Sequence, residues 1–253
     1  MFTHSPATDT SSWFESWFDS PYYPLLYSNR DESEAERFIS LICDHIDLPK
    51  GASVLDLACG RGRHSVTFSK LGYQVLGVDL SPSAIETASL KQSDQLYFRI
   101  HDIRNPLPET DFDLVVNLFT SFGYFENPLD DKLAMSNAFK ALKKRGIFIF
   151  DYLNVGPTIS QLIQDEVVTR GGVAFHIHRS VEGGFIQKSI DFDDHGKHYS
   201  FVERVRAYGH EELLGLIRGA GFDIRSIFGN YDLQSFEAQH SDRVIIIAQK
   251  MIF

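Results

Sequence analysis

A short glycine-containing segment carries the residues of this sequence that are best suited to bind a cofactor. It reads Asp56-Leu57-Ala58-Cys59-Gly60-Arg61-Gly62 and joins an apolar run to a stretch with helical periodicity. Glycine permits φ above zero and lets a ligand approach the backbone closely. A strand that ends in such a loop and continues as a helix is typical of a nucleotide-like cofactor site. By itself the Gly-x-Gly pair does not distinguish one such cofactor from another.

Acidic residues at the ends of three predicted strands narrow the choice of cofactor. Asp56 precedes the glycines, where a carboxylate repels a pyrophosphate and attracts the ammonium group of a methionine moiety; capping of the following helix is the alternative role. Asp79 is placed to accept from both hydroxyls of a ribose, and Asp102 to bind the exocyclic amine of adenine. The third glycine of Gly-x-Gly-x-x-Gly is missing, because position 65 is serine. These features favour S-adenosylmethionine (SAM) over a dinucleotide.

Strands and helices alternate on both sides of this loop. Such alternation predicts a parallel sheet with right-handed crossovers. Because the carboxyl ends of parallel strands share one edge, Asp56, Asp79 and Asp102 are expected to lie close together. The predicted strands are residues 53–57, 74–79, 96–101, 112–118 and 146–152, and the predicted helices are residues 63–71, 83–92 and 130–143.

The ends of these helices carry recognisable signals. Gly72 stops the first helix, and Ser81-Pro82 opens the second with an N-cap and a proline at the first helical position. Residues 143–145, Lys-Lys-Arg, place positive charge at the end of the third helix, before Gly146. We therefore expect the third helix to run through Lys143.

The remaining parts of the chain do not follow the alternation of parallel strands and helices. Residues 11–31 are rich in aromatic side chains, and prolines at positions 21 and 24 interrupt any long helix there. Residues 32–46 predict an amphipathic helix. Residues 165–206 carry strand-like stretches separated by Gly-rich and Asp/Gly-rich turns, which predicts an antiparallel meander. A helix at 210–219 and strands near 224–231 and 244–249 complete the chain.

The composition excludes several classes of protein. A net charge of −10 repels a phosphate backbone, so we expect no nucleic-acid partner. No apolar run has the length of a membrane span, and residues 1–20 lack the regions of a secretory signal. Cys43 and Cys59 have neither disulfide nor metal spacing and are interpreted as small buried side chains in a reducing compartment. We expect a cytoplasmic protein with no membrane contact and no metal site.

Together these motifs resemble those of the class I SAM-dependent methyltransferases. The resemblance rests on residues 54–80, on His101-Asp102-Ile103, and on residues 112–118. It implies an α/β fold with a Rossmann-like, doubly wound, mostly parallel seven-stranded sheet, an antiparallel terminal strand and a small antiparallel β insertion. It also implies three parts: residues 1–155 hold an N-terminal arm and the SAM-binding core, residues 156–206 form a lid or substrate insertion, and residues 207–253 complete the core.

The resemblance also assigns roles around the cofactor. Gly60 and Gly62 would pack on the methionine and ribose portions of SAM, Asp79 would hold the ribose, and the pair 102–103 would flank the adenine. Residues 118 and 119 would line the methionine end. The cofactor-binding residues that it implies are Tyr22, Tyr27, Arg30, Asp56, Ala58, Gly60, Gly62, Asp79, Leu80, Asp102, Ile103, Leu118 and Phe119. The product of the cofactor would be S-adenosyl-L-homocysteine.

The methyl acceptor is indicated by the segment after the fourth strand, which in this family often faces the reacting methyl group. Residues 119–125 resemble small-molecule methyltransferases, including the sugar-amine N-methyltransferases, more than nucleic-acid enzymes. Tyr124 stands where some sugar-amine enzymes carry a histidine, so it is the candidate catalytic base or substrate contact. Tyr22, Tyr27 and Arg30 form a group of the kind that closes on the SAM carboxylate, for which arginine offers a bidentate donor fork.

The function predicted from sequence is methyl transfer from SAM to a nitrogen or oxygen of a small-molecule acceptor, by direct in-line displacement. Two alternatives stay open. One is a SAM-binding protein without catalysis, serving as a sensor or partner subunit, because no base is defined. The other is an NAD-dependent oxidoreductase, against which the missing third glycine and Asp102 count. A homodimer is also left open.

Overall fold

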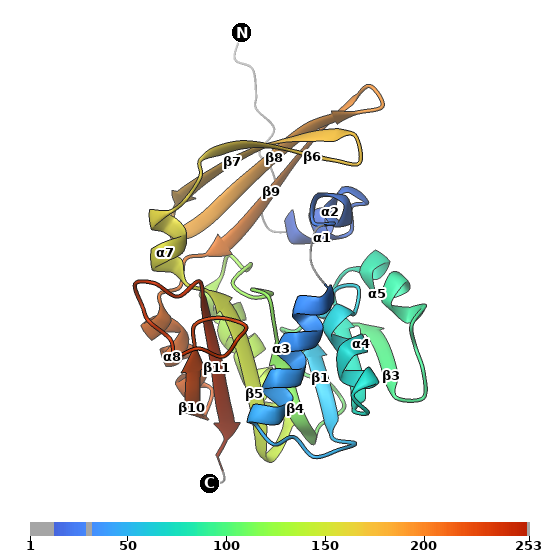
Figure 1. Cartoon of the computed structure of the whole chain (residues 1–253), viewed down its shortest axis with the longest axis vertical. Coiled ribbons are helices and arrows are strands. Elements are labelled where there is room, and N and C mark those ends of the chain that lie inside the picture. Colours follow the sequence, from blue (N-terminus) through green and yellow to red (C-terminus); the bar gives the residue numbers. More distant parts are fainter. Residues whose placement is uncertain (1–12, 29–31, 252–253) are drawn as a thin grey trace.

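Two β-sheets, one above the other in Figure 1, organise the residues that the computed structural model describes, 13–28 and 32–251. The lower, main sheet has seven strands and the upper sheet has four. Two short helices, α1 (Trp13–Phe18) and α2 (Tyr22–Leu26), lie between the sheets. We call residues 13–28 the arm and the upper sheet the lid.

The main sheet has the strand order β10-β11-β5-β4-β1-β2-β3. Strands β1 to β5 pair in parallel, and β11 runs antiparallel to both β5 and β10. The predicted mostly parallel sheet with an antiparallel last strand is therefore confirmed. The strands are β1 (Ser53–Leu57), β2 (Gln74–Asp79), β3 (Leu96–Ile100), β4 (Phe112–Asn117), β5 (Leu142–Leu153), β10 (Phe222–Phe228) and β11 (Arg243–Lys250).

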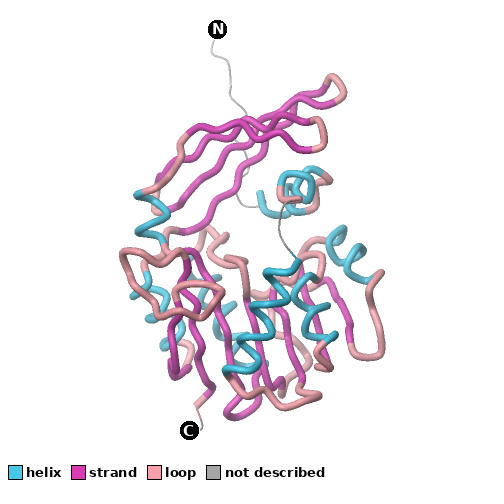
Figure 2. The backbone as a smooth tube through the Cα atoms, viewed as in Figure 1, coloured by secondary structure: helices cyan, strands magenta, loops and turns pink. Residues whose placement is uncertain are grey.

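Helices cover both faces of the main sheet, as the tube in Figure 2 also shows. Successive side chains on a strand point to opposite faces, so each buried strand needs an apolar layer on both sides. Val54 and Leu114 pack in a core with α3, α4 and α5, whereas Leu55 and Val115 pack in a second core with α6 and α8. The helices are α3 (Glu32–His45), α4 (Arg63–Lys70), α5 (Pro82–Ser89), α6 (Pro128–Ala141) and α8 (His210–Gly219).

The helix boundaries are mostly those that the sequence predicts, with one correction. Ser81 caps α5 by accepting a hydrogen bond from the amide of Ala84 at 3.1 Å. The prediction that α6 runs from 130 through Lys143 is wrong, because Asn127 caps a helix that ends at Ala141. Residues 143–145 belong instead to β5, where Lys143 pairs with Asp113 at the start of β4. The charge of Lys143 is therefore used across the sheet and not at a helix end.

The lid is the antiparallel meander that the sequence predicts, and α7 (Val155–Ser160) connects it to the main sheet. Its strands are β6 (Asp165–Arg170), β7 (Val173–Glu182), β8 (Phe185–Asp194) and β9 (Lys197–Arg206). Alternate residues at the start of β7 are buried and exposed, so one face of the lid is apolar. That face packs on the arm, where the rings of Trp17 and Phe201 lie 4.7 Å apart. The division of the chain at 155/156 and 206/207 stays a prediction.

Gly62 offers a test of how tightly the start of α4 packs. Its φ is 77°, and a Cβ there would lie 2.5 Å from Cζ of Phe98. Gly72 has a φ of 90° but open space around its Cβ position. We expect Gly62→Ala to lower the free energy of unfolding by about 1–2 kcal/mol more than Gly72→Ala, because both changes strain the backbone and only the first overpacks a buried ring. Urea denaturation measures the difference, and equal losses would contradict it.

Candidate functional site

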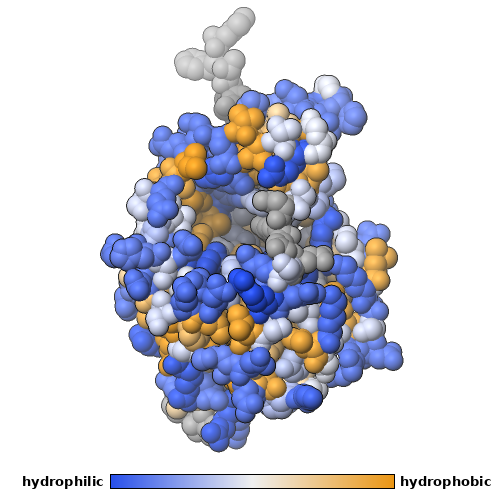
Figure 3. All heavy atoms as spheres, viewed as in Figure 1, coloured by the Kyte–Doolittle hydropathy of each residue, from blue (hydrophilic) through white to orange (hydrophobic). Residues whose placement is uncertain are grey.

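A cavity of about 460 Å³ lies at the carboxyl edge of the main sheet, beneath the arm and the lid. Figure 3 shows the surface hollowed between the lid and the main sheet. The cavity is lined by the loop after β1, by the ends of β2, β3 and β4, by aromatic side chains of the arm, and by Glu203 and Val205 of the lid. The predicted site residues that line it are Tyr27, Asp56, Ala58, Gly60, Asp79, Leu80, Asp102, Ile103, Leu118, Phe119 and Tyr124.

Asp79 fixes the glycine loop against the end of β2. Its carboxylate accepts one hydrogen bond from the amide of Gly60 at 2.7 Å and another from the amide of Ser81 at 2.9 Å. Burial raises the pKa of Asp79, and these backbone hydrogen bonds partly oppose the shift. The two oxygens of a carboxylate offer about four lone-pair sites, so the carboxylate keeps acceptor capacity toward the cavity. The open space at the Cβ position of Gly60, where φ is 57°, leaves room for a ligand beside that carboxylate.

Asp56 lies beneath the same loop and is 1% exposed. Its carboxylate accepts a hydrogen bond from the hydroxyl of Ser65 on α4 at 2.5 Å. Burial raises the pKa of Asp56 to about 7; the Ser65 hydrogen bond lowers it, and the charge of Asp79 raises it further. Ser65 therefore occupies the position of the missing third glycine with a structural role. Asp56 both anchors α4 and borders the cavity.

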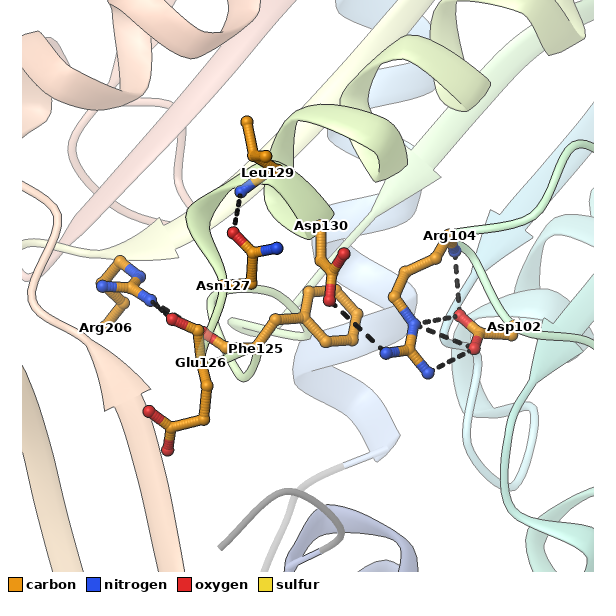
Figure 4. A network of polar contacts seen from close by, with 8 residues as sticks. All are labelled: Asp102, Arg104, Phe125, Glu126, Asn127, Leu129, Asp130 and Arg206. Atoms are coloured by element: carbon orange, nitrogen blue, oxygen red, sulfur yellow. Dashed lines mark hydrogen bonds and ion pairs between the residues drawn. The ribbon is translucent and has the colours of Figure 1, made fainter.

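Asp102 lies at the cavity edge after β3, but its carboxylate is already engaged by arginine (Figure 4). Arg104 donates to it through Nε at 2.9 Å and Nη2 at 2.6 Å, and reaches Asp130 of α6 at 3.5 Å. Burial raises the pKa of Asp102, but the hydrogen bonds from Arg104 outweigh it, so the pKa lies below its usual value. The guanidinium of Arg104 also lies 4.8 Å from the ring centre of Phe125.

The loop after β4 is held in an unusual conformation by a buried ion pair. Phe119 and Thr120 both have a φ of 58°, in the left-handed region. Asp151 of β5 is fully buried; its carboxylate accepts from the amide of Phe119 at 2.7 Å and pairs with Arg243 at 2.7 Å. Arg243 in turn donates to the hydroxyl of Thr120 at 2.8 Å. The pair therefore compensates the strain of a loop that lines the cavity.

The ring of Phe119 is fixed from three sides. Tyr231 stacks on it with ring centres 4.8 Å apart, and His64 stacks at 4.9 Å. The guanidinium of Arg63 lies 4.4 Å from its centre. Arg61, Arg63 and His64 also line the cavity, so the start of α4 adds cationic and ring nitrogen groups to the three carboxylates. The sequence analysis did not assign these residues a role, although their position beside Gly62 was a signal.

Tyr124 lies in an aromatic cluster that closes one side of the cavity. The rings of Trp13, Phe14 and Phe18 from the arm lie within 6.4 Å of it, centre to centre. Its hydroxyl donates to the carbonyl of Thr120 at 2.5 Å. The side chain is thus held in place by packing and by the loop after β4, and a role as a base stays a prediction.

The Tyr/Arg group predicted for the arm is only partly brought to the cavity. Tyr27 lines it, but its hydroxyl donates to Glu203 of the lid at 2.7 Å. Tyr22 does not line the cavity: its hydroxyl donates to Asp194 at 2.8 Å and its ring packs on Phe192. Its role in cofactor binding stays a prediction. Arg30 lies outside the described residues.

Gly62 does not line the cavity, because it packs against Phe98 of β3.

Glu203 lines the cavity, but its sequence context does not predict this position. Nothing in residues 197–206 distinguishes it from other charged residues on lid strands.

Within residues 13–28 and 32–251, no group of three His, Cys, Asp or Glu side chains is arranged to hold a metal ion. No helix among the described residues has the length and apolarity to cross a bilayer.

Comparison with known proteins shows that this chain is similar to methyltransferases. Residues 54–146 match the family described as a methyltransferase domain. The chain is 28% identical over 243 residues to a glycine/sarcosine N-methyltransferase of Parasynechococcus marenigrum, covering 88% of this chain and 79% of that protein. It is 26% identical to the dTDP-3-amino-3,4,6-trideoxy-alpha-D-glucopyranose N,N-dimethyltransferase of Streptomyces venezuelae, covering 82% and 91%. A SAM-dependent methyltransferase structure from Clostridium acetobutylicum superposes with a TM-score of 0.78 at 23% identity, covering 91% and 96%.

The fold and the matched domain agree with the resemblance that the sequence motifs indicate. Residues 54–146 match a methyltransferase domain, and the chain shares the fold of the solved structure from Clostridium acetobutylicum. The predicted resemblance to the class I SAM-dependent methyltransferases, including members that methylate amino sugars, is confirmed, and SAM is the cofactor of this class.

Proposed function

We propose that the chain transfers a methyl group from SAM to a nitrogen or oxygen of a small-molecule acceptor. The observation that carries the proposal is the cavity in which Gly60, Asp79 and Asp102 face an aromatic roof formed by the arm. Glycine, sarcosine and a nucleotide-linked amino sugar are the acceptors in the names of two relatives, and they support a small acceptor. Neither the non-catalytic SAM-binding protein nor the oxidoreductase receives support from the comparisons.

The residues at the sheet edge fit SAM in the proposed arrangement. Asp79, whose carboxylate keeps acceptor capacity, holds the ribose hydroxyls. Leu80 and Ile103 cover the adenine, and Asp102 accepts from its amine at a lone pair that Arg104 leaves available. Ala58, Leu118 and Phe119 border the methionine end, where Asp56 attracts the ammonium group.

The proposed methyl transfer needs little chemical activation by the protein. SAM supplies a methyl carbon that is already electrophilic, because its sulfur is a sulfonium. The chain's own residues therefore have to align the acceptor and exclude water. Tyr124 and the arm rings around it form the apolar wall that does so. Arg206, at the end of β9, ties residues 156–206 to the core by donating to the carbonyls of Phe125 and Glu126 (Figure 4).

The proposed setting is a cytoplasmic enzyme with a small-molecule substrate and no nucleic-acid or membrane partner. Both cysteines, Cys43 and Cys59, are buried and free, which supports a reducing compartment. A homodimer stays a prediction.

Titration calorimetry with SAM and with NADH, followed by turnover assays, tests the proposed function. We expect SAM binding without NADH binding, and conversion of SAM to S-adenosylhomocysteine in the presence of a panel of amines, amino sugars and phenols. NADH binding without a response to SAM would establish the oxidoreductase instead. SAM binding without turnover across the panel would favour the non-catalytic sensor.

The raised pKa of Asp56 predicts that cofactor affinity depends on pH. A carboxyl group whose pKa rises on folding binds its proton more tightly in the folded state. Its contribution to the stability of the fold therefore falls as the pH rises from about 4 to about 7. Cofactor affinity has the opposite dependence, because above pH 7 the ionised carboxylate attracts the ligand's ammonium group. We expect the affinity for S-adenosylhomocysteine to increase about five- to tenfold between pH 6 and pH 7.5. Calorimetry measures it, and Asp56→Asn, which keeps an acceptor for Ser65, is the control that should remove the dependence.

A further inference from the structure

A carboxylate from the lid faces the cavity opposite the cofactor edge. Glu203 lies on β9, and its side chain is 16% exposed. The other acids that line the cavity among the described residues, Asp56, Asp79 and Asp102, all follow strands of the main sheet. Glu203 therefore comes from a different sheet than the three acids assigned to the cofactor. An acid in this position has no role in the cofactor assignments above.

Glu203 is held in one orientation by donors from three elements. The indole of Trp17 donates to its Oε1 at 2.6 Å, and the hydroxyl of Tyr27 donates to both oxygens at 2.7 and 2.8 Å. Lys188 of β8 lies 3.5 Å from Oε2 and does not line the cavity. Its ammonium also donates to the hydroxyl of Tyr27 at 2.5 Å, so it partly compensates the charge of Glu203. The carboxylate is preorganised, so a ligand that binds it has little side-chain entropy to overcome.

The walls beside Glu203 are aromatic. Trp13, Phe18, Tyr23 and Tyr124 line the same cavity, together with Tyr27. Aromatic faces attract cations through their quadrupole, and they do so more strongly in a desolvated site. A carboxylate set among aromatic faces is suited to a group that carries or acquires positive charge. It is unsuited to a carboxylate or phenolate acceptor, which would bring a second negative charge next to Glu203.

We propose that Glu203 receives the acceptor as a basic amine and makes this enzyme an N-methyltransferase. The inference rests on the proposed function. Methylation of a neutral amine forms the N–C bond as the S–C bond breaks, and the electron pair of that bond stays on sulfur. Positive charge moves from sulfur to nitrogen, and no proton leaves in this step. Glu203 accepts an N–H hydrogen bond from the amine and stabilises the charge that develops on nitrogen.

The test compares amines with hydroxyl compounds of the same shape. Calorimetry with enzyme saturated in S-adenosylhomocysteine uses benzylamine against benzyl alcohol and glucosamine against glucose. We expect the amines to bind at least about tenfold more tightly, and Glu203→Gln to weaken amine binding and lower kcat/KM for amines by roughly 10- to 100-fold, the range for hydrogen bonds to a charged group. Glu182→Gln, an exposed acid at the end of β7, is the matched control and should change neither quantity.

The outcomes of this test separate this inference from the proposed function. If the wild-type enzyme binds no S-adenosylhomocysteine, the proposed function itself fails. If it binds this product but prefers the hydroxyl compounds, binds none of the amines, or retains full amine binding in Glu203→Gln, only the role of Glu203 is overturned. Should Glu203→Gln lower the Tm, Glu203→Asp keeps the charge. This variant is expected to keep the preference for amines, and its loss would count against the inference.

Discussion

Replacing Arg243 with methionine is expected to lower the free energy of unfolding by about 3–5 kcal/mol. The change leaves the fully buried carboxylate of Asp151 without its cation, and removing one partner of a buried ion pair has a cost of this order. It also removes the donor to Thr120, so the left-handed residues 119 and 120 lose part of what holds them. Urea denaturation measures the loss of stability. Cofactor affinity should fall as well, because Phe119 lines the cavity.

An exposed ion pair on the neighbouring strand provides the control. Arg225 and Asp223 of β10 lie 3.0 Å apart with half-exposed side chains, so Arg225→Met should change stability by less than about 1 kcal/mol. The double variant Asp151→Asn with Arg243→Met should regain part of the lost stability, since the uncompensated charge is gone. A loss below 1 kcal/mol in Arg243→Met alone would show that the pair does not hold the loop.

The fold was predictable because its signals are local and repeated. Strand runs such as 53–57 and 112–118 alternate with helices whose caps stand in the sequence, and Ser81 caps α5 as its type and position predict. The error at α6 has the same origin. Asn127 and Pro128 form a cap signal that competes with the basic run at 143–145, and Lys143 of that run pairs with Asp113 on the neighbouring strand.

The meeting of three acids at one edge of the sheet was predictable for a similar reason. The carboxyl ends of parallel strands lie at one edge of the sheet. Asp56, Asp79 and Asp102 therefore lie close together whatever the lengths of the intervening loops. No general rule of strand topology predicts which residues line the side of the cavity that is proposed for the acceptor. Glu203 reaches the cavity through the register of β9 in the lid and through contacts with an arm more than 170 residues away in sequence. Tyr22 and Tyr27 are alike in type, and only the packing of the lid separates their roles.

The same contrast indicates where this protein's specificity resides. In the proposed arrangement the sheet edge binds SAM, whereas the arm and the lid contribute the aromatic wall, Tyr124 and Glu203. The arm and the lid hold each other through Trp17, Tyr27 and Glu203. A change in the acceptor-binding wall therefore also changes how the cavity is closed. Substitutions at this contact are expected to alter acceptor affinity more than cofactor affinity.

Asp79→Ala should weaken SAM binding by about 1.5–3 kcal/mol, the scale of hydrogen bonds to a charged group. The change removes the acceptors proposed for the ribose hydroxyls, and it also frees the amide of Gly60, so the glycine loop loses its fixed position. Calorimetry measures the affinity, and the Tm shows whether the fold is kept.

A carboxylate at the opposite edge of the same sheet separates the ligand effect from the structural one. Asp113, at the start of β4, also accepts from a backbone amide, that of Ser53 at 2.9 Å, but it does not line the cavity. Asp113→Ala should therefore lower stability without changing the affinity for SAM. If both variants bind SAM as the wild type does, the ribose assignment of Asp79 is wrong. If both lose affinity equally, Asp79 acts through the stability of the sheet and not through contact with the cofactor.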